Sequence, residues 1–156
     1  MIRVLFIARY RDATMNRKVD RLIEQPDLTL WHICPRFWKD ELLEIKQSSS
    51  AAGNFKRIAL PMIGSPADPH RSFFRSFSLG LHQLRPHLIH AEEEPDSLSA
   101  LQIAIARRLF APRAKLILYT WQNIKRPRSI EVRSIMHLTL RASAAVLCAN
   151  QVAVAV

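Results

Sequence analysis

Residues 87–120, HLIHAEEEPDSLSALQIAIARRLFAPRAKLILYT, decide the fold. An apolar run at His87–Ala91 is followed by an acidic turn and then by apolar side chains at helical spacing. Asp96 or Ser97 is suited to begin that helix, and Pro112 to end it. A second apolar run, Lys115–Thr120, follows the helix. The stretch therefore predicts two parallel strands joined by a crossover helix.

The same unit repeats along the chain of 156 residues. The six apolar runs start about 30 residues apart, the length of a strand, a helix and two short loops. Their nearly continuous apolar character is typical of strands covered on both faces. We therefore expect one domain, residues 1–156, with a Rossmann-like doubly wound α/β fold: a mainly parallel sheet of about six strands with helices on both faces. The other four runs are Ile2–Ala8, Leu28–Cys34, Lys56–Pro61 and Ala145–Ala149.

Helical periodicity predicts helices in the segments between the runs. The chain ends on the apolar stretch Gln151–Val156, where a further helix should begin, so we expect the domain to be incomplete at its C-terminus. Phe37–Ile45 has weaker helical character, and Gln47–Asn54 is predicted as a loop. Three of the predicted helices carry these apolar residues at helical spacing: Val19, Leu22 and Ile23, in a helix capped by Thr14 or Asn16; Phe73, Phe77, Leu81 and Leu84, in a helix that ends before Pro86; and Ile130, Ile135, Leu138 and Ala142.

The composition limits the class of protein and its partners. Hydrophobic residues make up 49% and the formal charge is +10, which suits a globular domain with an anionic partner or one that is basic only for solubility. Cys34 and Cys148 lie in or beside apolar runs, as buried thiols of a reducing compartment do. Because no stretch has the length of a signal peptide core or a spanning helix, we expect a cytoplasmic protein that can lie on the inner membrane face.

Ligands of open parallel sheets bind at the carboxyl ends of the strands, so the residues there are the site candidates. Arg9 and Tyr10 follow the first run in a loop without glycine, which excludes a dinucleotide fingerprint there. Glu92, Glu93 and Glu94 follow the fourth run. These acids complement the dipole of the next helix, or they accept hydrogen bonds from sugar hydroxyls or orient a basic group.

Trp121, Gln122 and Asn123 follow the fifth run, and the basic stretch 125–128 comes next. An indole beside amides suits a polyol, because the ring stacks on the apolar face of a sugar while the amides bind its hydroxyls. The alternative is a half-buried tryptophan that seals the end of the sheet. No histidine has a partner at metal-ligand spacing, since His87 and His90 point to opposite faces of a strand, so we expect no metal.

Several stretches, in this order, resemble the N-terminal domain of the family 4 retaining glycosyltransferases, which have the two-domain GT-B architecture. The most specific are RPHLIHAEEEPDSL at 85–98, LYTWQNI at 118–124 and LRASAAVLCAN at 140–150. The opening strand at 2–8, residues 16–22 and 27–30, and the CPRFWK segment at 34–39 are also similar.

The resemblance implies the acceptor-side half of an enzyme that transfers a sugar from a nucleotide-sugar donor to a saccharide or lipid-linked acceptor. A C-terminal domain absent from this chain would bind most of the donor, so the chain alone should be inactive and needs no cofactor of its own. Glu94 would border the cleft, and Gln122 stands where many members have a histidine that contacts the transferred sugar. The expected substrate contacts are Arg9, Tyr10, Glu93, Glu94, Trp121, Gln122, Asn123 and Asn150.

A second hypothesis is a non-catalytic basic module that binds a membrane surface or a phosphorylated ligand. Phe73, Phe74 and Phe77, with Arg71 and Arg75, would form a face against anionic lipid unless these phenylalanines belong to the core. A nucleic-acid surface would need clustered arginines and lysines with aromatic residues between them, and the basic residues here are too sparse for that.

Overall fold

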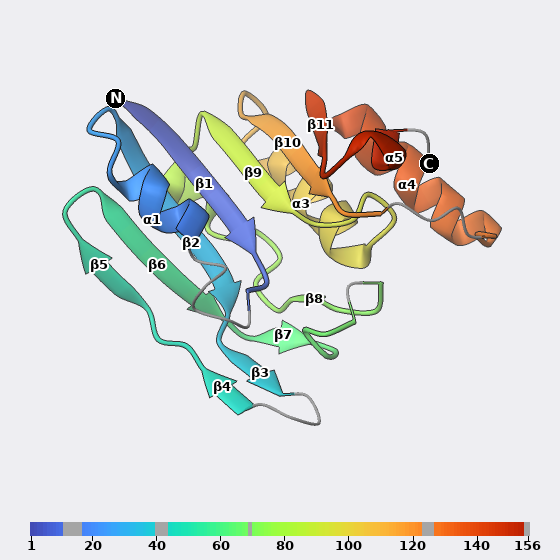
Figure 1. Cartoon of the computed structure of the whole chain (residues 1–156), viewed down its shortest axis with the longest axis horizontal. Helices are drawn as coiled ribbons and strands as arrows, with labels where there is room; N and C mark the ends of the chain where they lie inside the picture. Colours follow the sequence, from blue (N-terminus) through green and yellow to red (C-terminus); the bar gives the residue numbers. More distant parts are fainter. Residues whose placement is uncertain (11–16, 40–43, 69, 123–126, 155–156) are drawn as a thin grey trace.

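A seven-stranded sheet forms the centre of the computed structural model (Figure 1). The structure describes residues 1–10, 17–39, 44–68, 70–122 and 127–154. In chain order the elements are β1 (Ile2–Ala8), α1 (Arg17–Ile23), β2 (Leu28–Pro35), β3 (Phe37–Lys39), β4 (Glu44–Lys46), β5 (Ser50–Ala52), β6 (Phe55–Leu60), β7 (Met62–Ile63), β8 (Phe73–Phe74), α2 (Leu81–Leu84), β9 (Leu88–Glu92), α3 (Leu98–Phe110), β10 (Lys115–Thr120), α4 (Ile130–Ala142), β11 (Ala145–Cys148) and α5 (Gln151–Val154).

The strand order is β11-β10-β9-β1-β2-β6-β5. The chain starts in the middle at β1, builds outward through β2 and β6, then returns to β9 and builds the other way through β10 and β11. The six strands from β11 to β6 pair in parallel, which confirms the predicted Rossmann-like doubly wound sheet. The edge strand β5 pairs antiparallel with β6, so the prediction of a loop at 47–54 is wrong for Ser50–Ala52.

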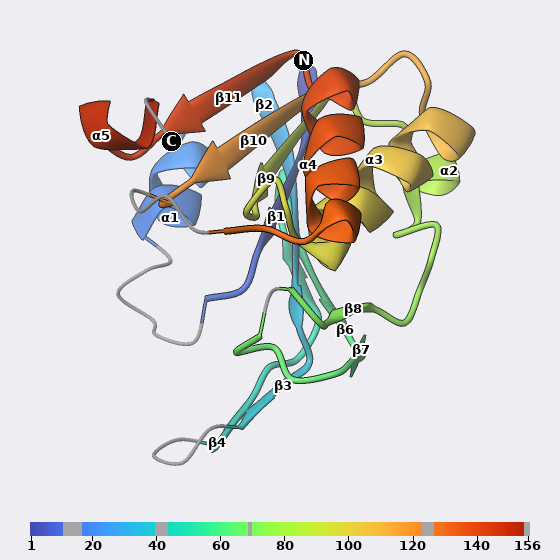
Figure 2. The same ribbon diagram turned by 90° about the vertical axis from the view of Figure 1, so that its right-hand side faces the viewer.

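Helices cover both faces of this sheet, with α1 on one side and α2, α3 and α4 on the other (Figure 2). Leu5 and Ile7 of β1 face the larger core on the α3 side. Val4, Phe6 and Ala8 face the smaller core, which includes Val19 of α1. Because alternate side chains enter different cores, β1 is buried from Val4 to Ala8, and this explains its unbroken apolar run.

The crossover helix α3 has the predicted start and end. The Ser97 Oγ accepts a hydrogen bond from the backbone N–H of Ala100 at 3.0 Å, which is the N-cap arrangement. The last helical residue, Phe110, is followed by Ala111 and then Pro112. Local signals were sufficient here because the cap, the apolar spacing and the proline all agree.

The prediction of one helix through residues 73–84 is wrong in its first part. Phe73–Phe74 forms the strand β8, and only Leu81–Leu84 is helical. The reason lies 28 residues away, where the buried Gln102 amide accepts from Phe74 N–H at 2.8 Å and donates to Phe74 O at 2.7 Å. Phe74 is fully buried while Phe77 is 49% exposed, so Phe74 belongs to the core and cannot face lipid.

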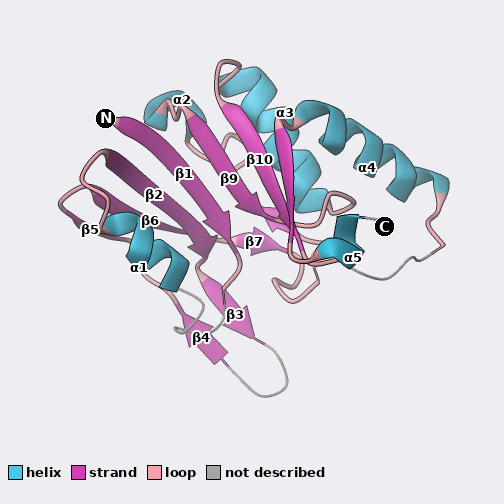
Figure 3. Ribbon diagram, turned by 45° about the horizontal axis from the view of Figure 1, so that its top comes forward, coloured by secondary structure: helices cyan, strands magenta, loops and turns pink. Residues whose placement is uncertain are grey.

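The weak helical pattern at Phe37–Ile45 is also misleading, because this segment contains an antiparallel hairpin of β3 and β4. The hairpin projects beyond the carboxyl ends of the central strands (Figure 3). Trp38 is buried, whereas its neighbours Phe37 and Lys39 are exposed. That alternation has the period of a strand, but three residues are too few to reveal it in the sequence.

The remaining helices lie where they were predicted. α1 carries Val19, and its expected caps Thr14 and Asn16 fall outside the described residues. α4 starts after Ser129, and α5 starts at Gln151. Among the helices that the structure describes, none is both long and apolar enough to cross a membrane.

Both cysteines are free thiols, as expected. Cys34 is buried and Cys148 is half-buried. Burial raises the pKa of the Cys34 thiol to about 11, so the thiol is protonated and unreactive at neutral pH.

Gly64→Ala should destabilise the loop between β7 and β8. Gly64 has a φ of +81°, and an added Cβ would lie 2.5 Å from the carbonyl oxygen of Arg71. We expect a loss of about 2 kcal/mol in the free energy of unfolding, measured by urea denaturation. Gly53→Ala is the matched control, because Gly53 has a φ of +56° but open space around it, and it should lose only about 1 kcal/mol. Equal losses would contradict the predicted clash.

Candidate functional site

The winding direction of the sheet reverses between β1 and β9, which are neighbours. The loops that leave their carboxyl ends diverge there, and in this fold that point is the usual ligand crevice. Here it is bridged by an ion pair between the Arg9 guanidinium and the Glu93 carboxylate. Their side chains are only 7% and 1% exposed, so the pair is buried.

The Arg9 guanidinium donates its hydrogen bonds to other groups of the protein. Its Nε donates to Glu93 Oε1 at 2.7 Å, Nη2 donates to Glu93 Oε2, and Nη1 donates to Ser72 Oγ at 2.7 Å. Burial raises the pKa of the Glu93 carboxyl, and the charge of Arg9 opposes that effect. The predicted contacts Arg9 and Glu93 therefore meet each other, and they tie the β1 and β9 loops to the segment before β8.

A second polar group lies on the α1 side of the same crevice. The Tyr10 hydroxyl donates to Glu92 Oε2, and Lys18 Nζ lies 2.6 Å from Glu92 Oε1. Burial, with the hydrogen bond to Glu92 and the charge of that group, raises the pKa of Tyr10, so its hydroxyl stays protonated. Lys18 also lies 4.0 Å from the centroid of the Tyr119 ring, a cation–π contact.

Glu94 joins the ends of β9 and β10. Its Oε2 accepts from the Thr120 hydroxyl, and its Oε1 accepts from the backbone N–H of Trp121 at 2.9 Å. Thr120 Oγ1 in turn accepts from the backbone N–H of Gln122 at 3.1 Å. No cation among the described residues forms an ion pair with Glu94, unlike its neighbours Glu92 and Glu93. Within that part of the chain, the partners of this carboxylate are hydrogen-bond donors and not cations.

Trp121 supplies an exposed aromatic surface at the mouth of the crevice. It is 59% exposed, and its ring meets Tyr119 edge to face, with 5.1 Å between the ring centroids. It lines a cavity of about 230 Å³, which is small for a site that encloses a ligand. No sequence pattern indicates Tyr119 or Trp38 as a site residue, although both line this cavity with Arg9, Pro66, Ala67, Glu92, Glu93, Glu94 and Trp121.

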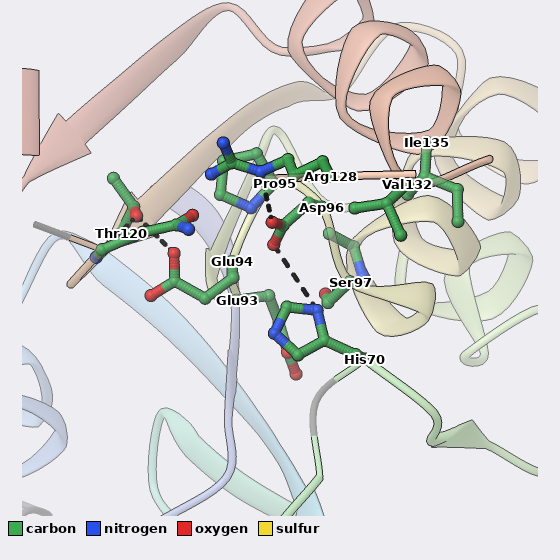
Figure 4. Close-up of polar contacts among 12 residues, drawn as sticks. His70, Glu93, Glu94, Pro95, Asp96, Ser97, Thr120, Arg128, Val132 and Ile135 are labelled. Atoms are coloured by element: carbon green, nitrogen blue, oxygen red, sulfur yellow. Dashed lines mark hydrogen bonds and ion pairs between the residues drawn. The ribbon is translucent and has the colours of Figure 1, made fainter. Parts of the chain in front are cut away.

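Asp96 connects three segments that are distant in the sequence (Figure 4). Its Oδ2 accepts from Arg128 Nε at 2.9 Å, and its Oδ1 lies 3.6 Å from His70 Nδ1. Asp96 is 4% exposed. The sequence pattern indicates Asp96 only as a helix start, but in the turn between β9 and α3 it binds Arg128, which precedes α4, and lies near His70, which precedes β8.

The other predicted contacts are placed differently. Gln122 follows Trp121 at the crevice and is half-buried. Asn150 caps α5, since its Oδ1 accepts from Ala153 N–H at 2.9 Å. Asn123 lies outside the described residues. The structure thus brings Arg9, Tyr10, Glu93, Glu94 and Trp121 together, as the carboxyl-edge rule predicted.

Within the described residues, no three His, Cys, Asp or Glu side chains gather as ligands for a metal ion. Comparison of the chain with family models, curated proteins and solved structures finds no match.

Proposed function

We propose that the carboxyl-edge crevice is a saccharide site and that this chain is the acceptor-side half of a retaining glycosyltransferase. The observation that carries the proposal is Trp121, an exposed indole beside Tyr119 on a residue whose backbone N–H donates to the Glu94 carboxylate. A ring face and hydrogen-bond acceptors at one mouth suit a sugar, which has an apolar face and peripheral hydroxyls. The ordered sequence motifs described above support the transfer reaction.

In this proposal the charged residues shape the crevice rather than react. Arg9 and Glu93 neutralise each other, and Glu92 is paired with Lys18. Glu94 and Gln122 are the side chains proposed to bind acceptor or transferred-sugar hydroxyls. The donor nucleotide would be bound mainly by a second domain, because rate requires donor and acceptor to be held together in a closed, dry cleft.

A cytoplasmic location at the inner membrane face completes the proposal. Its support is the net charge of +10, which favours an anionic surface. The acceptor would then be a lipid-linked saccharide presented at that surface.

Trp121→Ala should weaken saccharide binding about 3- to 10-fold, because it removes the stacking surface. Saturation-transfer NMR with methyl α-D-glucopyranoside, methyl α-D-mannopyranoside and N-acetylglucosamine measures this on the wild-type chain and the variant. Trp121→Phe should retain most of the binding, since a ring face remains.

Phe77→Ala is the control, because Phe77 is also exposed, at 49%, and packs against Phe110 away from the crevice. It should leave saccharide binding unchanged. If none of the three sugars binds the wild-type chain, or if both alanine variants lose binding equally, the saccharide proposal is wrong.

A further inference from the structure

A second cavity lies at the opposite edge of the sheet. The amino ends of β1, β9 and β10 lie along one edge, next to α2 and to the end of α3 (Figure 3). A cavity of about 590 Å³ opens there, larger than the one at the crevice. The residues that line it include Arg3, Arg85, His87 and Arg113.

The arginines give the lining of this cavity a positive charge. Three arginines line it, and no Asp or Glu is among its lining residues in the part of the chain that the structure describes. Within that same part, the guanidinium groups of Arg85 and Arg113 have no hydrogen-bond or ion-pair partner. Gathering cations without a counter-charge costs free energy, and an anionic ligand would offset that cost.

The donors of this cavity are held in place. Arg3 Nε donates to the carbonyl oxygen of Arg85 at 2.8 Å, which leaves both terminal nitrogens of Arg3 available. His87 Nδ1 accepts from the backbone N–H of Arg3 at 3.3 Å, so the neutral ring carries its proton on Nε2 and can donate from there. Backbone hydrogen bonds from His87 to Arg3 and from Lys115 to His87 fix the strand ends.

Arg85 occupies a position where glycine would be less strained. It is the C-cap of α2, with φ 46° and ψ 55°, in the left-handed region. A side chain in that region costs about 1 kcal/mol, so its presence is consistent with a use for the guanidinium.

One wall of the cavity is apolar. Phe110 is 37% exposed and lies beside Pro86 and Pro112 in the lining. A ligand that fits this cavity therefore combines a multiply charged anion with an apolar or aromatic group. A phosphate monoester has this chemistry, because it carries nearly two negative charges at neutral pH and offers oxygens that guanidinium forks bind.

We infer that this amino-edge cavity binds an organic phosphate monoester through Arg3, Arg85 and Arg113, with the organic group against Phe110. The site is independent of the saccharide crevice, at the other end of the strands. The ester is either a soluble molecule or the headgroup of a lipid such as phosphatidic acid, since both present the same phosphate chemistry.

The test is isothermal titration of the full chain with phenyl phosphate, beside co-sedimentation with phosphatidylcholine vesicles with and without phosphatidic acid. The variant Arg85→Gly/Arg113→Ala removes two guanidiniums, and glycine at 85 also relieves the left-handed strain, so the fold should be kept. Its affinity for the phosphate monoester should fall by about 10-fold or more. The control Arg133→Ala/Arg141→Ala removes two exposed arginines of α4 and the same charge.

Phenyl phosphate binding that only the first variant weakens supports the site and a soluble ligand. Sedimentation that requires phosphatidic acid and is lost only in the first variant supports the site and a lipid ligand. Absence of both interactions in the wild-type chain, or an equal loss in the two double variants, overturns the inference. Thermal unfolding of both variants verifies that neither result reflects misfolding.

Discussion

Arg9→Ala is expected to lower the free energy of unfolding by about 3–5 kcal/mol, the largest effect of any single change proposed here. The substitution leaves the Glu93 carboxylate, 1% exposed, without its cation. It also removes the donor to Ser72 Oγ, which connects the crevice to the segment before β8. A loss of this size corresponds to a fall in Tm of about 10 °C for a domain of this length.

Urea denaturation and thermal unfolding measure this loss. Arg21→Ala is the matched control, because Arg21 and Glu24 form an exposed pair with side chains 81% and 58% accessible. That variant should lose no more than about 0.5 kcal/mol. The double variant Arg9→Met/Glu93→Leu should regain much of the stability, since it removes both charges together. A loss for Arg9→Ala as small as for Arg21→Ala would show that the buried pair is not required for folding.

The stability of the fold is also expected to fall by about 3 kcal/mol between pH 6.5 and pH 4 through His32 alone. His32 lies fully buried between the sheet and α1, beside Phe6 and Tyr10 and opposite Arg57 of β6. Burial, with the positive charge of Arg57, lowers its pKa from 6.5 to about 4. Neither ring nitrogen has a hydrogen-bond partner among the described residues.

The direction follows from proton binding in the two states. Above pH 6.5 the ring is neutral both folded and unfolded, so it adds no pH dependence. Below that value the unfolded chain binds a proton that the folded chain does not, and this binding stabilises the unfolded state increasingly until the folded pKa is reached. The stability associated with a neutral His32 is therefore complete above pH 6.5 and lost as the pH falls to about 4.

His32→Leu should reduce the slope of unfolding free energy against pH in this interval. It should also raise stability at neutral pH by about 1–3 kcal/mol, because it removes two unpaired buried nitrogens. Chemical denaturation at several pH values measures both effects. His137→Ala, at an exposed position of α4, is the control and should keep the wild-type slope. An unchanged slope in His32→Leu would show that this ring does not remain neutral in the folded chain.

The sequence by itself determined the parallel sheet, because its strands and crossover helices carry strong local signals. Apolar residues run without a break from Val4 to Ala8 in β1 and from Leu116 to Tyr119 in β10, and α3 has a capping serine and a terminating proline. The helical spacing gave a wrong prediction at Phe73, because the segment is held as a strand by a residue distant in the sequence. Gln102 pairs with the backbone of Phe74 on both sides, and no local pattern indicates a contact 28 residues away.

The edge of the sheet where Glu93, Glu94 and Trp121 gather was also determined by the sequence, because parallel strands place their carboxyl ends together. Only the tertiary structure decided what each side chain does there. Arg9 and Glu93, 84 residues apart, meet each other in a buried pair, whereas Trp121 faces solvent. The physical reason is that strand and helix preferences depend on neighbours in the chain, while charge pairing and exposure depend on which segments the fold packs around each group.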